Sequence, residues 1–494
     1  MSDINELAEK RLKSRIRKIK KCNKSEEEKE KFFSQLGTSF EIFFPPTKKS
    51  DTVSDSIMIW VTPEGKVLDA EYSYEEPEEE QYTSIPLKEK DLKPFLEAFA
   101  DMKFELDDVW MIVNNSLDEV KKRENALAII KDWVLNKSRD SLYDLTGLSG
   151  GFIASPSELN LLETYVGPAI FEEELQKVGI EHMGGEKVLP LNRTSSGILA
   201  TILALVSENT NVVHYLAELP AHPSIPRSCA LVNANYSETD NFDEFTIPEN
   251  TSLVVITGST MDHKVIDLEN FKKVIEMAHD KNIPVMVDDA SGARLRTVVF
   301  NQPKACDLGA DISITSTDKL MSGPRGGLMA GRSDLIDEIK VKVNQFGLEA
   351  QPPAILAMLN GIKNFNGDNL IKSFSRKDEL LDLLNQNFNN FKTTPTGVMI
   401  TPKDLASELK VSHNLSDNDV AFVFSFILLK EHGIITIPPV SMPGASATIR
   451  FDLSTSDAFN LDLEDLNKKI VSSFNNLEKL VINEDECREI VFNF

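Results

Sequence analysis

Strand-length apolar runs alternate with an amphipathic segment in the middle of this chain. The run SLVVIT, residues 252–257, is followed by the helix-like segment DLENFKKVIEMAHDKN. A second run, IPVMV, precedes Asp288, and a third, within DISITSTDK, precedes Lys319. Such alternation predicts βαβ units and a parallel sheet, which binds ligands at the carboxyl ends of its strands. We therefore expect an α/β domain in which the polar strand ends line one crevice.

Asp288 and Lys319 are the residue types that pyridoxal 5'-phosphate (PLP) requires at such a crevice. A lysine in a partly desolvated site has a lowered pKa, so a useful fraction is neutral amine that forms a Schiff base with an aldehyde. A carboxylate beside the pyridine nitrogen keeps it protonated, and the ring then acts as an electron sink. Ala290 leaves space for a flat ring against the strand. Lone Asp and Lys residues also end strands in α/β proteins without a cofactor, so this pair alone leaves both interpretations open.

An anion site is predicted upstream, in VLPLNRTSSGILATILALV. An apolar run reaches Asn192 and Arg193, and a helix is expected from about Ile198. The residues between them are small or carry hydroxyl groups: Thr194, Ser195, Ser196 and Gly197. Free N–H groups at a helix N-terminus bind anions, which fits the cofactor's phosphate; an N-cap without a ligand is the alternative. Further expected cofactor contacts are Ser259, Ser316 and Arg325.

The order of these elements resembles the fold type I PLP enzymes. The segments VDDASGAR and DKLMSGPRGG are similar to bacterial selenocysteine synthase, the L-seryl-tRNA(Sec) selenium transferase. Six segments resemble the selenocysteine-synthase-like PLP proteins of methanogenic archaea: YDLTGLSGGF, NRTSSGILATILAL, ELPAHPSIPRSC, TSTDKLMSGPRGG, FGLEAQPP and MPGASATIR. The resemblance extends from about Ser138 to the C-terminus, and residues 1–137 resemble no family in this way.

The resemblance implies a homodimer, or a multiple of dimers, and further site residues. His222 is the ring expected to stack on the cofactor, with His214 and Tyr215 as alternatives. Arg450, in the strand-like run ATIRFDL, is expected to bind the substrate's α-carboxylate; a structural ion pair is the alternative. Arg193 and Gln351 are also expected near the substrate. Gln351, together with Glu349, is expected to contribute to the neighbouring subunit's site.

Length and composition are those of a globular protein of several domains. The chain has 494 residues, of which 41% are hydrophobic. Three domains are expected: an α+β accessory domain over 1–137, the PLP-binding large domain over 138–371, and a small α+β domain over 372–494 with strands at IITIPPV and ATIRFDL. Neither an eighteen-residue apolar run nor a signal peptide is present, so we expect a cytoplasmic protein without membrane contact. The four cysteines are scattered, which predicts neither a disulfide framework nor a metal site.

The net charge of -25 argues against broad affinity for nucleic acid. The segment KRLKSRIRKIKKCNK, residues 10–24, is the local exception; it is either a tRNA contact or a solvated helix face. We therefore expect a PLP-dependent transferase or lyase that performs β-elimination or replacement at an amino acid's Cα and Cβ. A free amino acid is the favoured substrate. The alternatives are a tRNA-dependent selenocysteine synthase and a PLP-binding scaffold without turnover.

Overall fold

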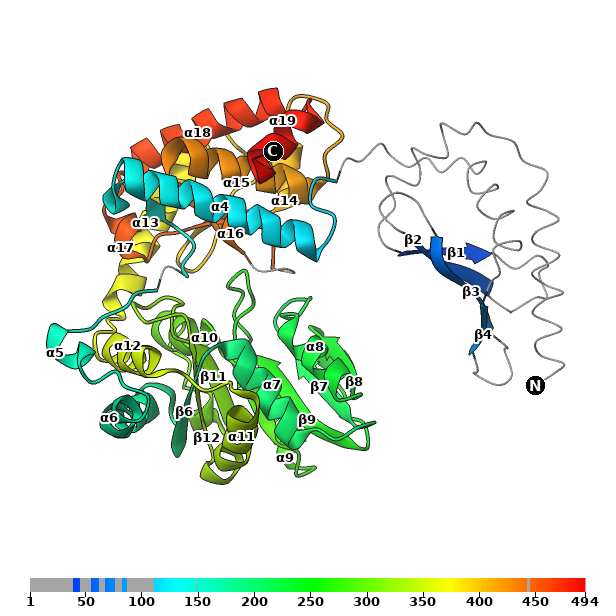
Figure 1. Ribbon diagram of the computed structural model, residues 1–494, viewed down its shortest axis with the longest axis vertical. Helices are drawn as coiled ribbons and strands as arrows, with labels where there is room; N and C mark the ends of the chain where they lie inside the picture. Colours follow the sequence, from blue (N-terminus) through cyan, green and yellow to red (C-terminus); the bar gives the residue numbers. More distant parts are fainter. Residues whose placement is uncertain are drawn as a thin grey trace. The chain divides into compact units, whose positions relative to one another are not determined.

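The computed structural model describes residues 39–44, 55–61, 67–75, 82–86 and 111–493, apart from 149 and 442–444. These residues form two compact units that divide between Asp118 and Glu119 (Figure 1). The basic segment 10–24, with Cys22, lies outside the described residues. No helix in the described ranges is long and apolar enough to cross a bilayer, and no group of side chains there forms a metal site.

The first unit contains a four-stranded antiparallel sheet in sequence order. Its strands are β1 (Ser39–Phe44), β2 (Asp55–Val61), β3 (Val67–Glu75) and β4 (Tyr82–Pro86). In the register of β1 and β2, Ser39 pairs with Trp60, Ile42 with Ile57 and Phe44 with Asp55. The α+β accessory domain expected over 1–137 stays a prediction.

The second unit is built on a seven-stranded sheet in the order β6-β12-β11-β10-β9-β7-β8. All neighbours are parallel except β12, which runs antiparallel to β11 and β6. The strands are β6 (Lys187–Leu191), β7 (Asn211–Tyr215), β8 (Asn235–Thr239), β9 (Thr251–Thr257), β10 (Val285–Asp288), β11 (Ile312–Ser316) and β12 (Gly327–Gly331). The mainly parallel α/β sheet expected from the sequence is confirmed.

Helices cover both faces of this sheet (Figure 1). One face packs against α7 (Thr194–Leu205), α8 (Ser224–Leu231) and α11 (Ser333–Phe346). The other packs against α6 (Val166–Met183), α9 (Leu268–His279) and α12 (Pro352–Lys363). Because the central strands are buried on both faces, they read in the sequence as unbroken apolar runs; residues 253–256 are fully buried.

The second unit also contains a helical domain with a small antiparallel sheet. The strands of this sheet are β13 (Lys392–Thr393), β14 (Gly397–Ile400) and β16 (Ile449–Asp452). Its helices are α4 (Ser116–Asn136), α13 (Asp368–Leu384), α14 (Pro402–Glu408), α15 (Asp417–His432), α18 (Leu463–Leu480) and α19 (Glu484–Phe492). Ser416 caps α15 by accepting a hydrogen bond from the Asp419 N–H, and Gly433 ends it with a φ of 66°. Helix α4 packs in this second unit, since Asn125 donates to the Val491 carbonyl at 2.9 Å. The second compact unit begins at Glu119 and so includes most of α4, whereas the expected domain boundary at 137 lies after this helix.

Short elements complete the second unit. They are η1 (Arg139–Ser141), β5 (Tyr143–Asp144), α5 (Pro156–Leu159), η2 (Phe242–Glu244), α10 (Gly292–Arg294), η3 (Leu295–Val299), η4 (Cys306–Leu308), β15 (Ile434–Ile435), α16 (Ile437–Val440) and α17 (Ser456–Phe459). The run IITIPPV is therefore a strand only at its start. Pro438 and Pro439 occupy the first turn of α16, where proline's fixed φ suits a helix.

Candidate active site

Asp288 and Lys319 lie at the carboxyl ends of neighbouring parallel strands. Asp288 is the last residue of β10 and pairs in register with Ile314 of β11, and Lys319 follows the end of β11 by three residues. Asp288 is 6% exposed, and its Oδ1 has no hydrogen-bond partner within the described residues. Burial raises the pKa of Asp288 to about 6, although the charge of Lys319 opposes the rise. Burial likewise lowers the pKa of Lys319, which favours the neutral amine.

Arg294 holds the main chain around Lys319. This fully buried guanidinium donates through Nε to the Lys319 carbonyl at 2.8 Å and through Nη2 to the Ser316 carbonyl. Leu320, the next residue, has a φ of 55°, which is strained for a large side chain, and its N–H donates to the Gly147 carbonyl at 3.1 Å. These bonds fix the direction in which the Lys319 side chain leaves the chain. Sequence reasoning missed Arg294, although it ends the motif VDDASGAR.

Asp289 has a different role from its neighbour Asp288. Its carboxylate is buried and accepts two hydrogen bonds from Arg296, one of them from Nε at 3.0 Å. Gly258 and Gly292 are needed here, because a Cβ at either position would lie 2.0 Å from the Asp289 Oδ1. The paired Asp289 therefore anchors the loop, while the unpaired Asp288 oxygen is left for a ligand.

The predicted phosphate cup forms the first turn of α7, which begins at Thr194 and not near Ile198. The Arg193 carbonyl accepts from the Ser196 and Gly197 N–H groups at 3.2 and 3.3 Å. Gly327 of β12 packs directly beneath this turn, since a Cβ there would lie 2.7 Å from the Thr194 nitrogen. The N-terminus of α7 thus lies at the same edge of the sheet as the end of β11, with its dipole favouring an anion.

The other expected cofactor contacts surround this edge. The Ser259 hydroxyl is 2.7 Å from that of Ser291, and both are buried. Ser316 donates to Asp318, and the Arg325 Nε lies 3.9 Å from the same carboxylate. Ser316 and Arg325 therefore converge on Asp318, and their contacts to a phosphate stay a prediction. Ala290 is partly exposed, and its carbonyl accepts from Arg294 at 3.2 Å.

Of the three candidate rings, His214 and Tyr215 are engaged in the core. Tyr236 donates to Glu238 at 2.5 Å, so the His214 Nδ1–H donates to Tyr236 at 2.8 Å, and Nε2 accepts from Thr257 at 2.8 Å. Burial lowers the pKa of His214 to about 3, so the imidazole in this network is neutral. Tyr215 packs edge-on against Phe242 and Phe245.

His222 is the remaining ring. His222 is exposed, and its Nδ1 is 2.8 Å from the Ser224 hydroxyl. Desolvation by the protein around it lowers the pKa of His222, and the positive charges of Lys319 and Arg227 lower it further. A neutral ring beside Lys319 agrees with the predicted stacking role, which stays a prediction.

Arg450 lies on β16 and is 2% exposed. Its Nη1 donates to the Met261 carbonyl at 2.7 Å and its Nη2 to the Thr146 carbonyl at 2.9 Å. Its Nε is buried without a partner in the described part of the chain. The positive charge of Arg450 lowers the pKa of Lys319. Burial, and after it the positive charges of Arg450 and Lys319, hold the pKa of His263 well below its usual value. Arg450 therefore lies near Lys319 with part of its donor capacity free.

The loop after β9 ties the two parts of the second unit together. The Met261 carbonyl accepts from Arg450, the Asp262 carboxylate accepts from Ser446 and Thr448, and the His263 Nδ1 is 3.5 Å from the Thr396 hydroxyl. His263 is buried with a φ of 67°, a strained conformation for a histidine. Sequence reasoning missed this histidine, because the partner residues that define it lie far along the chain.

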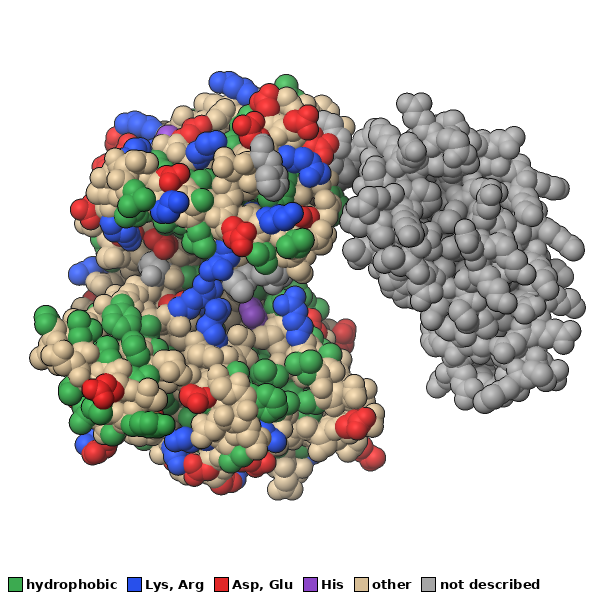
Figure 2. Space-filling model, viewed as in Figure 1, with side chains coloured by type: hydrophobic (Ala, Val, Ile, Leu, Met, Phe, Trp, Pro, Cys, Tyr) green, Lys and Arg blue, Asp and Glu red, His purple; other side chains and the backbone are tan. Residues whose placement is uncertain are grey.

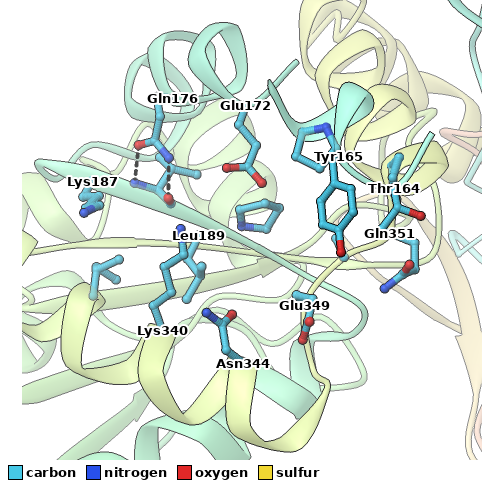
Figure 3. Close-up of a pocket in the computed structure, with 16 residues that line it drawn as sticks. Thr164, Tyr165, Glu172, Gln176, Lys187, Leu189, Lys340, Asn344, Glu349 and Gln351 are labelled. Atoms are coloured by element: carbon cyan, nitrogen blue, oxygen red, sulfur yellow. Dashed lines mark hydrogen bonds between the residues drawn. The ribbon is translucent and has the colours of Figure 1, made fainter. Parts of the chain in front are cut away.

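A second cavity, of about 420 Å³, lies along the outer edge of β6 (Figure 3). Of the predicted site residues it includes Glu349 and Gln351, the exposed N-cap of α12, and not Lys319 or Asp288. Here Gln176 both donates to the Val188 carbonyl and accepts from the Val188 N–H, as Figure 3 shows. The side chain thereby satisfies an exposed strand edge that would otherwise pair with another chain. The expected contribution of Gln351 to a neighbouring subunit stays a prediction.

The residues at the end of β10 and β11 fit PLP. A buried carboxylate with an unpartnered oxygen matches the ring nitrogen, a desolvated lysine matches the aldehyde, and the α7 N-terminus matches the phosphate. Asp288, Lys319 and the turn Thr194–Gly197 are the residues that would hold it.

The chain is similar to known proteins over most of its length. A protein described as "UPF0425 pyridoxal phosphate-dependent protein" from Methanosphaera stadtmanae is 52% identical over 373 residues, which cover 75% of this chain and 97% of that one. Its counterpart from Methanothermobacter thermautotrophicus is 50% identical over 382 residues, 77% of this chain and all of that one. The chain belongs to the UPF0425 family. The model of the UPF0425 C-terminal domain matches residues 387–462. PLP as cofactor, and the resemblance to the methanogen proteins, are thereby confirmed.

More distant relatives of this UPF0425 protein include the L-seryl-tRNA(Sec) selenium transferase of Aquifex aeolicus. It is 25% identical over 277 residues, which cover 51% of this chain and 58% of that one. Among solved structures, N-succinyldiaminopimelate aminotransferase from Mycobacterium tuberculosis aligns with a TM-score of 0.49 at 16% identity, over 73% of this chain and 98% of that one. A complex of SepCysS with the SepCysE N-terminal domain aligns with a TM-score of 0.48 at 15% identity, over 68% and 95%.

Proposed function

We propose that this protein catalyses a PLP-dependent β-elimination or β-replacement on a free amino acid. The observation that carries the proposal is the pair formed by Lys319 and Asp288 at neighbouring strand ends, one with a lowered and one with a raised pKa. PLP, when bound, supplies an electron sink for the charge that develops at Cα. Lys319 as neutral amine takes the Cα proton, and the bond from Cβ to its substituent breaks with the electron pair on the leaving group. Asp288 keeps the ring nitrogen protonated.

Arg450 supports a free amino acid as the substrate. Its guanidinium is buried near Lys319, and its Nε has no partner in the described part of the chain. A free α-carboxylate supplies the anion that this guanidinium lacks, whereas an amino acid esterified to tRNA does not. The overall charge of -25 also disfavours a large polyanionic substrate.

A tRNA-dependent transferase is the second candidate. It is favoured by the 25% identity to proteins named L-seryl-tRNA(Sec) selenium transferase and by the basic segment 10–24. In that case the ester substrate makes no use of Arg450, and binding weakens steeply as salt is added.

The deciding experiment measures pyruvate and ammonia released from a panel of amino acids with β-leaving groups. We expect release by the wild type, none by Lys319→Ala, and a loss of binding of roughly 2 to 5 kcal/mol in Arg450→Gln. Deletion of residues 1–24 should leave free amino acid turnover unchanged. If aminoacyl-tRNA alone is consumed, and the deletion stops this while Arg450→Gln does not, the tRNA-dependent candidate is correct and our proposal is wrong.

A further inference from the structure

Two arginines beside the cofactor-binding edge form no ion pair with any residue that the structure describes. Arg193 precedes the first turn of α7, is half-buried, and forms no ion pair or side-chain hydrogen bond with any described residue. Arg123 lies in α4, is half-buried, and donates through Nε to the Val440 carbonyl at 3.2 Å. The structure shows no ion pair of Arg123 within the described ranges, whereas its neighbour Lys122 is paired with Glu119 at 2.6 Å. Unpaired, half-buried guanidinium groups are unusual in a chain of net charge -25.

The two groups stand on different elements: Arg123 lies on α4, where it bonds the Val440 carbonyl, and Arg193 directly precedes α7. Gly327 packs against the Arg193 main chain, since a Cβ at Gly327 would lie 2.7 Å from the Arg193 carbonyl carbon, and Arg325 lies two residues before Gly327 in the chain. Burial lowers the pKa of Arg193, and the charges of Arg325 and Arg123 lower it further, against the attraction of Asp318. Figure 2 shows basic side chains, with a histidine among them, gathered where the sheet domain meets the C-terminal helices.

This arrangement has three guanidinium groups and one carboxylate. Asp318 is 3.9 Å from Arg325, so it offsets one positive charge and leaves Arg123 and Arg193 to repel each other. The cofactor's own phosphate already has the N-terminal turn of α7 and Arg325 as candidate partners. The remaining positive charge therefore calls for a second anion. A doubly charged oxyanion with three oxygens suits two guanidinium forks better than a single carboxylate does.

We propose that Arg123 and Arg193 form a subsite for a phosphomonoester on the side chain of the substrate. This rests on the proposed function and names its substrate class: an amino acid whose β-substituent is a phosphate, with O-phospho-L-serine as the simplest member. The Cα proton passes to Lys319, the Cβ–O bond breaks, and its electron pair leaves on the phosphate. One water then completes the conversion to pyruvate, ammonia and inorganic phosphate. The two arginines stabilise the charge of the departing group, which increases as the bond breaks.

The test compares O-phospho-L-serine with β-chloro-L-alanine, whose leaving group carries no phosphate. The holoenzyme, Arg123→Gln, Arg193→Gln and the control Arg488→Gln are assayed with both. We expect kcat/KM for O-phospho-L-serine to fall about tenfold or more relative to β-chloro-L-alanine in the first two variants, and this ratio to stay unchanged in Arg488→Gln. Arg488 is partly exposed and bonds Glu484 one turn away, so it is a matched surface arginine. Inorganic phosphate should inhibit the wild type competitively and the two variants less.

Several results overturn the proposal. An unchanged substrate ratio does so, and so does a loss of visible cofactor absorbance in Arg123→Gln and Arg193→Gln, because the arginines would then be ligands of the cofactor's phosphate. Turnover of β-chloro-L-alanine without turnover of O-phospho-L-serine removes the subsite and leaves the proposed function standing. If neither amino acid reacts, but equilibrium dialysis shows phosphate binding to the holoprotein that both variants weaken, the subsite stands and the proposed function fails. If O-phosphoseryl-tRNA is also consumed, and Arg123→Gln and Arg193→Gln lower its turnover as they lower that of O-phospho-L-serine, the subsite binds the phosphomonoester of an amino acid carried on RNA.

Discussion

Replacing Asp288 with asparagine should stabilise the protein without its cofactor at neutral pH while removing its function. Asp288 is 6% exposed, one of its oxygens has no hydrogen-bond partner in the described part of the chain, and burial raises its pKa from an ordinary 3.8 to about 6. Burying an ionised carboxylate without full compensation costs stability, and an amide of the same shape avoids that cost.

The sign and size follow from proton linkage. A carboxyl group whose pKa is higher in the folded than in the unfolded protein binds more protons when folded, so its contribution to the free energy of unfolding falls as the pH rises through this window. The change from 3.8 to about 6 corresponds to roughly 3 kcal/mol in total, of which about 1.4 kcal/mol falls between pH 5 and pH 8. Asp288→Asn lacks this contribution. Its free energy of unfolding should therefore rise by about 1.4 kcal/mol relative to that of the wild type between pH 5 and pH 8.

The assay is urea unfolding of the cofactor-free wild type and variant at pH 5, 6, 7 and 8. Asp243→Asn, which removes an exposed carboxylate, is the control and should run parallel to the wild type. If Asp288 holds the ring nitrogen of PLP, the protonated nitrogen would stabilise the carboxylate, so the pH-dependent difference should disappear in the PLP-loaded protein. A stability difference that is constant from pH 5 to pH 8, or that narrows as the pH rises, would refute the assignment of Asp288 as a buried carboxylate with an unmet charge.

Three further perturbations test the scaffold around the site. Gly327→Ala places a methyl group 2.7 Å from the Thr194 nitrogen, so PLP titration should show cofactor affinity weakened by about tenfold or more; unchanged affinity would contradict the close packing. Arg294→Met leaves the Lys319 and Ser316 carbonyls without their donor, and chemical denaturation should show roughly 3 to 5 kcal/mol less stability. His214→Phe removes the bridge between Tyr236 and Thr257 and should cost roughly 1 to 3 kcal/mol, again by denaturation; a neutral result would mean that water replaces the ring.

The elements that carry the cofactor residues could be predicted because their signals are local. Strands β9 and β10 contain continuous apolar runs that end in polar residues, as a parallel sheet buried on both faces requires, and β11, with the sequence ISITS, is a strand-like run that leads to Lys319. Asp288 and Lys319 could be placed at one edge for the same reason.

The missed features depend on residues distant in the sequence. Arg294 looked like one basic residue in a motif, and only the fold shows it donating to Lys319, 25 residues later. The bonds of Arg450 to the carbonyls of Thr146 and Met261 could not be predicted, because they join segments 304 and 189 residues apart, while its role toward the substrate stays a prediction. The second half of IITIPPV forms a helix because its prolines suit a first turn, an effect that its apolar pattern concealed.

The central claim is that Lys319 is the residue to which PLP bonds. The most direct measurement is borohydride reduction of the PLP-loaded protein, proteolysis, and mass spectrometry of the labelled peptide. We predict that the reduced cofactor is found on Lys319 in the wild type and on no peptide of Lys319→Ala, which should also lose the visible absorbance of the holoprotein. A label on another lysine, or equal labelling of the wild type and Lys319→Ala, would contradict the account.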